Sequence, residues 1–128
     1  MRKILAGVFM ACTAAAAAQT PDVGATMTVG TAVAKRGEVA YGELQVPKGS
    51  DAAATIGVAV MHGAHPGTVV AFVSGSHGTE YASIVALSRF IARVDPKTLA
   101  GTVIVAPLLN VASFEQMKPH VNPIDGKG

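Results

Sequence analysis

The sequence predicts an α/β fold with a mixed sheet that contains one parallel strand–helix–strand unit. Two nearly continuous apolar runs, residues 68–74 (TVVAFVS) and 102–109 (TVIVAPLL), have the composition of buried strands. Between them, apolar residues recur at helical spacing over residues 80–94. Upstream, residues 26–61 contain shorter strand patterns separated by turns. Together these patterns favour a sheet with both antiparallel and parallel strands.

The first residues have the pattern of an export signal. Arg2 and Lys3 precede an apolar core over residues 4–11, and three alanines at 16–18 supply small residues for cleavage. This order is typical of a signal peptide, and the apolar core is too short to span a bilayer. We therefore predict that residues 1–18 are a signal peptide and that the protein is periplasmic or secreted.

Removal of the signal changes the charge and the cysteine count. Without Arg2 and Lys3, eight basic side chains balance the eight acidic ones, and the mature chain is formally neutral. No basic cluster remains that could bind nucleic acid or an anionic membrane, so we expect a small-molecule partner. Cys12, the only cysteine, is also lost, which excludes a disulfide. The alternative is a lipoprotein signal with Cys12 as the lipidated residue, but Phe9 and Met10 stand where such a signal prefers leucine and a small residue.

Three strands are predicted in the first half of the mature chain. Residues 19–35 form a polar leader and a first strand, 27–34. Strands over residues 38–46 and 55–61 follow, with glycine- and proline-containing turns between them. These segments precede the parallel unit.

The parallel unit itself has clear boundaries. We expect the strand at 68–74 to be buried on both faces, and the helix at 80–94 to stop at Pro96. A strand, a helix and a second strand at 102–109 form a right-handed crossover, so the two strands should be parallel. Pro107 removes one ladder hydrogen bond, so the second strand should end early or lie at an edge.

A histidine and a glutamate lie three residues apart in the turn between strand and helix. The motif is GSHGTEY, with His77 and Glu80 among small residues. Ligands of open α/β sheets bind just beyond the carboxyl ends of the strands, and zinc accepts both imidazole nitrogen and carboxylate oxygen. The alternative is structural: a glutamate in the first helical turn is favoured by the helix dipole, and a histidine in a glycine turn can form a local hydrogen bond.

The remaining candidate residues carry weaker signals. His62 and His65 are predicted to lie in a loop before the strand, where they form a rival pair of ligands, and His120 is predicted to be an isolated, solvated side chain. A serine hydrolase is a further alternative, with Ser76 in a strand-to-helix turn. The nucleophile elbow reads G-x-S-x-G, however, and here His77 stands where the serine should be.

Three separated motifs give a more specific indication. They are the segment from RGEVAYGELQ to GSHGTEYASIVALSRFI, followed by GTVIVAPLLNVASFEQ and NPIDGKG. With these motifs the chain resembles the succinylglutamate desuccinylase/aspartoacylase family, which is related to zinc carboxypeptidases. The resemblance covers residues 36–128. It implies that this segment is the amino-terminal part of a deacylase or carboxypeptidase-like catalytic domain, with a zinc carboxypeptidase-like fold that is incomplete at the C-terminus.

The resemblance also implies a site and a reaction. His77 and Glu80 match the first two ligands of one zinc ion, whereas the third histidine, the substrate-orienting Asn-Arg pair and the general base lie beyond Gly128 in the family pattern. Thr79 and Gly128 depart from the aspartate and asparagine that many relatives have there. The implied enzyme is a zinc-dependent hydrolase of small acyl compounds, cleaving an amide or an ester, and this chain alone is expected to be inactive. The alternative is a non-catalytic exported binding domain of the same fold.

Overall fold

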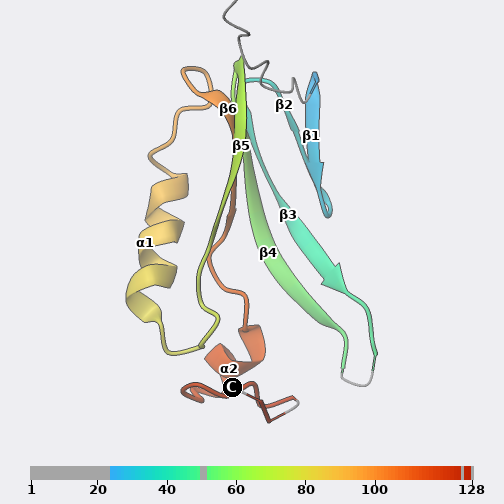
Figure 1. Ribbon diagram of the computed structural model, residues 1–128, viewed down its shortest axis with the longest axis vertical. Coiled ribbons are helices and arrows are strands. Elements are labelled where there is room, and N and C mark those ends of the chain that lie inside the picture. The colour runs from blue at the N-terminus through green and yellow to red at the C-terminus, as the bar shows by residue number, and fades with distance from the viewer. Residues whose placement is uncertain (1–23, 50–51, 125, 128) are drawn as a thin grey trace, which may run out of the picture.

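The computed structural model describes residues 24–49, 52–124 and 126–127, so the predicted signal peptide over residues 1–18 lies outside the described residues. A four-stranded sheet with the order β3-β4-β6-β5 forms the centre of the molecule (Figure 1). Its strands are β3 (Glu38–Val46), β4 (Ala54–His62), β5 (His65–Val73) and β6 (Ala100–Ala106). β5 and β6 are parallel, and the other neighbouring strands are antiparallel. The mixed sheet is therefore confirmed.

The helix α1 (Tyr81–Ile91) connects the two parallel strands and covers one face of the sheet. Its core residue Ile91 packs with Ala59 of β4 and Val105 of β6. The ring of Phe90 meets that of Phe72 edge to face, with the centroids 5.5 Å apart. The predicted strand–helix–strand unit is confirmed, although the helix ends three residues before the predicted limit.

A hairpin covers the opposite face (Figure 1). We predicted one strand over residues 27–34, and this is wrong: the chain forms β1 (Thr26–Val29) and β2 (Ala32–Lys35), which pair antiparallel. The reversal occurs at Gly30, whose φ of 57° lies in the left-handed region that glycine adopts without strain. Alternation along β2 then buries its alanines against Val58 and Val60 of β4.

The position of β5 in the sheet differs from the prediction, whereas β6 meets one of its two predicted alternatives. β5 lies at the edge and is exposed along its length rather than buried on both faces, since only β6 pairs with it. β6 ends at Ala106, directly before Pro107, as predicted, but it lies between β4 and β5 and not at an edge. Pro66 lies within β5, where the pairing with β6 shifts register between His65 and Val69.

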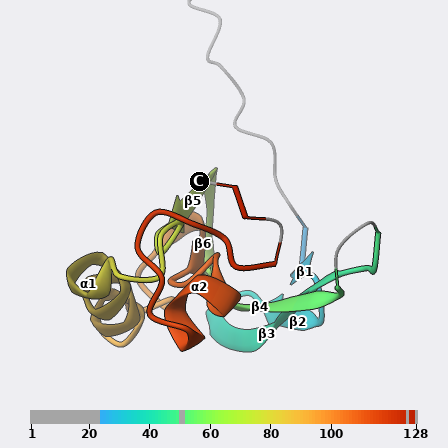
Figure 2. The same cartoon turned by 90° about the horizontal axis from the view of Figure 1, so that it is seen from below.

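Both parallel strands end on the same side of the sheet. The loop before α1, the short helix α2 (Val111–Glu115) and the last described residues gather at this end (Figures 1 and 2). No helix in the described part of the chain is long and apolar enough to cross a membrane.

Candidate metal centre

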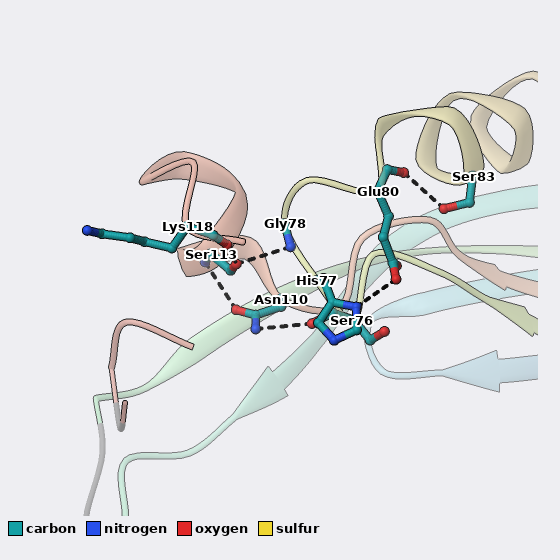
Figure 3. Close-up of polar contacts among 8 residues, drawn as sticks. All are labelled: Ser76, His77, Gly78, Glu80, Ser83, Asn110, Ser113 and Lys118. Carbon is teal, nitrogen blue, oxygen red and sulfur yellow. Dashed lines mark hydrogen bonds and ion pairs between the residues drawn. The ribbon is translucent and has the colours of Figure 1, made fainter. Parts of the chain in front are cut away.

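The loop between β5 and α1 brings the two predicted metal ligands together. The backbone N–H of Glu80 donates to the carbonyl of His77 at 3.1 Å, which closes a turn directly before α1. The two side chains face each other, and His77 Nδ1 lies 2.8 Å from Glu80 Oε1 (Figure 3). Their side chains are 38% and 36% exposed, respectively, so a ligand from solvent can reach both.

This hydrogen bond keeps Glu80 ionised. A carboxylate can only accept a hydrogen bond, so His77 Nδ1–H is the donor. The bond from His77 holds the pKa of the Glu80 carboxyl below its ordinary value of 4.5, and desolvation opposes this effect more weakly. At neutral pH the turn therefore presents an imidazole and an anionic oxygen side by side.

The pair fits two positions of a zinc site by donor type and by position. Two ligands that are each about 2.1 Å from one tetrahedral zinc lie about 3.4 Å apart, so Nδ1 and Oε1 need to separate by only a fraction of an ångström. Zinc binding at Nδ1 also requires that this nitrogen gives up the proton that it donates to Glu80. Across residues 24–49, 52–124 and 126–127, no group of three or more His, Cys, Asp or Glu side chains forms that could hold a metal ion. The described residues thus provide this pair, and not a complete set of three protein ligands.

We predicted that His120 is isolated, and this is wrong. Its ring packs edge to face against the ring of His77, with the centroids 4.7 Å apart. The side chain is nevertheless exposed, in agreement with the prediction that it is solvated. The contact joins residues 43 positions apart in the chain, and no sequence pattern links them.

The rival pair of histidines lies in strands rather than in a loop. His62 ends β4 and is completely buried. Its Nδ1 lies 2.8 Å from Thr102 Oγ1 and its Nε2 lies 3.1 Å from the carbonyl oxygen of Gly24, so both ring nitrogens are engaged. His65 begins β5 and is exposed. These two side chains therefore do not form a second metal site.

Part of the chain that includes this geometry is similar to known proteins. The family model for the succinylglutamate desuccinylase/aspartoacylase catalytic domain matches residues 66–125, which include His77 and Glu80. An aspartoacylase family protein from Mesorhizobium loti is 28% identical, with a TM-score of 0.63. The product-bound ectoine utilization protein EutE from Ruegeria pomeroyi is 26% identical, with a TM-score of 0.60. Over residues 66–125 the chain is similar to the succinylglutamate desuccinylase/aspartoacylase family.

The similarity covers only part of these relatives. In both structures, and in a succinylglutamate desuccinylase/aspartoacylase from Rhodobacter sphaeroides (25% identity, TM-score 0.55), it spans 70% of this chain and 28% of the other. The zinc carboxypeptidase-like fold expected from the resemblance agrees with these neighbours. No protein of curated function matches the chain significantly.

Two polar residues of the matched segment carry no signal that the sequence-based prediction used. Asn110 and Ser113 lie at the start of α2 and form hydrogen bonds with the loop that carries His77 (Figure 3). Asn110 occupies the position before the first helical residue, and its Oδ1 accepts from the N–H of Ser113. An asparagine before a short apolar run is a recognisable helix start. Its link to a loop 34 residues upstream is not encoded in any local pattern.

The two larger cavities in the described part of the chain do not include the candidate ligands. One of about 530 Å³ is formed by α1 and β5, and another of about 440 Å³ lies between α1 and the strands β3 and β4. Neither is lined by His77 or Glu80. A smaller cavity of about 150 Å³ is lined by Asn110, whose side chain donates to the carbonyl of Ser76 in the loop that carries His77.

Proposed function

We propose that the protein is a zinc-dependent hydrolase of small acyl compounds, in which His77 and Glu80 are two ligands of one zinc ion. The observation that carries the proposal is the approach of His77 Nδ1 to Glu80 Oε1, 2.8 Å apart at the carboxyl end of a parallel strand. Ligands of α/β sheets bind just beyond the carboxyl ends of the strands. The family match over residues 66–125 supports the assignment independently.

The two side chains have separable roles in this proposal. His77 provides an imidazole nitrogen and Glu80 an anionic oxygen, and their mutual hydrogen bond holds the two partly exposed side chains together. The zinc, when bound, supplies an electrophile for a carbonyl oxygen and lowers the pKa of water. The general base and the residues that recognise substrate are expected outside the described residues.

The substrate is proposed to be a small N-acyl or O-acyl compound. The name of the Ruegeria relative describes an ectoine utilization protein with bound product, which supports a small-molecule substrate. The mature chain carries no net charge and no basic cluster, which disfavours nucleic acid and anionic membranes.

Zinc content and hydrolysis test the proposal. The protein encoded by the complete reading frame should contain one zinc per chain and hydrolyse an N-acyl amino acid or a simple ester. His77→Ala and Glu80→Ala should each reduce zinc content and abolish turnover, whereas Glu115→Ala, an exposed carboxylate in α2, should change neither. Equal zinc in all four proteins contradicts the proposal. The 128-residue chain should bind zinc weakly and show no turnover, because catalytic zinc sites use three protein ligands.

A non-catalytic binding domain is the competing function. It is supported if the complete protein binds zinc through His77 but turns over no acyl substrate, since the fold and the metal would then persist without chemistry.

We further propose export with removal of residues 1–18. Mass spectrometry of protein from the periplasm or the medium should find Gln19 at the amino terminus. Intact Met1 in soluble cytoplasmic protein contradicts this proposal, and a lipid on Cys12 supports the lipoprotein alternative.

A further inference from the structure

We propose that Asn110 and Ser113 are positioning residues of the metal centre, and that they fix the backbone on both sides of His77. This inference rests on the proposed zinc site. It goes beyond that site because neither residue is a candidate ligand, and both lie more than 30 positions away from the loop that they hold. Figure 3 shows the two side chains between α2 and the loop.

Asn110 ties the first half of the loop to α2. Its backbone N–H donates to the carbonyl of Gly75 at 2.8 Å, and its side-chain Nδ2 donates to the carbonyl of Ser76 at 3.2 Å. Its Oδ1 accepts from the N–H of Ser113 at 3.1 Å. One asparagine therefore caps the helix and holds the residue before His77.

Ser113 ties the second half of the loop to the same helix. Its side chain is completely buried, and its Oγ accepts from the N–H of Gly78 at 3.1 Å while donating to the carbonyl of Lys118. Gly78 approaches so closely that an added Cβ would overlap the backbone of Ser113 and Phe114. The serine thus connects the loop, α2 and the segment that follows it.

The position of these two bonds determines their effect on His77. The carbonyl of Ser76 belongs to the peptide plane before His77, and the N–H of Gly78 belongs to the plane after it. Because peptide units are planar, holding both planes restricts φ and ψ of His77 and hence the direction of its Cα–Cβ bond. The half-exposed imidazole is then directed at Glu80 by backbone restraint as well as by its own hydrogen bond.

The substitution Asn110→Asp separates this role from helix capping. Aspartate still accepts from Ser113 N–H as a helix cap, but it cannot donate to the Ser76 carbonyl. Partners outside the ligand set typically contribute 10- to 100-fold to metal affinity, so we expect zinc affinity to fall about tenfold. The new negative charge would by itself attract zinc, so a loss of affinity cannot be a charge effect.

Zinc titration of the full 128-residue chain by calorimetry, with the imidazole resonances followed by NMR, tests the proposal. The variants are Asn110→Asp and Ser113→Ala. Their matched controls are Asn122→Asp, whose Oδ1 accepts from Ile124 N–H away from the loop, and Ser88→Ala, whose hydroxyl donates within α1. Thermal unfolding of every protein is measured in parallel, so that affinity and stability are compared separately.

Each outcome decides the proposal. Weaker zinc binding by Asn110→Asp and Ser113→Ala, with both controls like the parent, supports it. Affinity equal to the parent, or a loss shared by the controls, overturns it. If Ser113→Ala fails to fold, the zinc affinity of Asn110→Asp alone tests the proposal. If Asn110→Asp also fails to fold, the residue has a purely structural role and the proposal is overturned. His77→Ala separates the two hypotheses: unchanged zinc binding in that variant refutes the zinc site itself.

Discussion

At the scale of single residues, the pair His77 and Glu80 shows how a local pattern acquires its chemistry from geometry. The three-residue spacing permitted both a metal site and a capped helix. In the structure Glu80 directly precedes α1 but makes no side-chain cap, and its carboxylate instead accepts from His77. The residue pattern identified the pair, and only the turn geometry decided where the side chains point.

The pH dependence of Glu80 provides a test of this pair. Since the hydrogen bond from His77 lowers the folded-state pKa, its contribution to stability is present above the ordinary value of 4.5 and is lost as pH falls through the lowered pKa. His77→Ala should move the pKa of Glu80 upward toward 4.5, as measured by NMR titration of the side-chain carboxyl carbon. An unchanged or lower pKa in the variant would show that the bond does not form in solution.

Close packing at Gly78 gives a second prediction at this scale. Gly78→Ala should reduce the free energy of unfolding by about 1 to 3 kcal/mol, as overpacking typically does, because its Cβ would overlap the backbone of α2. Urea denaturation measures the change. The control is Gly57→Ala in β4, where an added Cβ meets no heavy atom within 4 Å. Equal stability of both variants would exclude the close approach.

At the scale of elements, the strand with clear alternation was more predictable than the first strand and the second helix. The strand predicted at residues 38–46 is confirmed with identical limits as β3, because alternating side chains and flanking turns are local signals. The first strand was wrong because one left-handed glycine divides it, and α2 was missed because five residues are too few for a periodic pattern. The histidine at the end of β4 was placed in a loop because its partners, Thr102 and Gly24, are distant in the chain.

His62 should stabilise the junction of β4, β6 and the residues before β1. Its buried ring bonds to Thr102 of β6 and to the carbonyl of Gly24. His62→Ala should lower the free energy of unfolding by at least about 2 kcal/mol, because it opens a cavity and removes a partner from a buried hydroxyl. His65→Ala, at an exposed position of β5, should change it by no more than about 0.5 kcal/mol. Comparable losses in the two variants would contradict the buried placement of His62.

At the scale of the whole molecule, the most unusual surface is the free edge of β5. Its exposed apolar side chains lie on both faces of the strand: Val69, Val70, Phe72 and Val73. The sequence predicted the apolar character of this strand correctly. It could not predict the exposure, because which strands lie at an edge depends on the order of the sheet and not on any one segment.

This edge should promote self-association of the 128-residue chain. Unpaired, apolar edge strands pair with other chains, and a charged side chain there opposes pairing. Val70→Lys should therefore reduce the concentration-dependent increase in mass seen by light scattering. Val33→Lys adds the same charge at an exposed position of β2 and should have no such effect. Similar behaviour of the two variants would locate the association elsewhere.

The bonds between α2 and the loop that carries His77 have a consequence for the order of events in folding. The loop is held by residues 34 and 35 positions later in the chain, so its final shape requires β6 to be already paired beside β5. Pairing of the sheet therefore carries the entropic cost of bringing these distant residues together, before any ion can bind. In zinc fingers the relation is reversed, and the chain is unfolded without metal. We accordingly expect a chelator to remove zinc from this protein while far-ultraviolet circular dichroism and the thermal transition of the sheet persist.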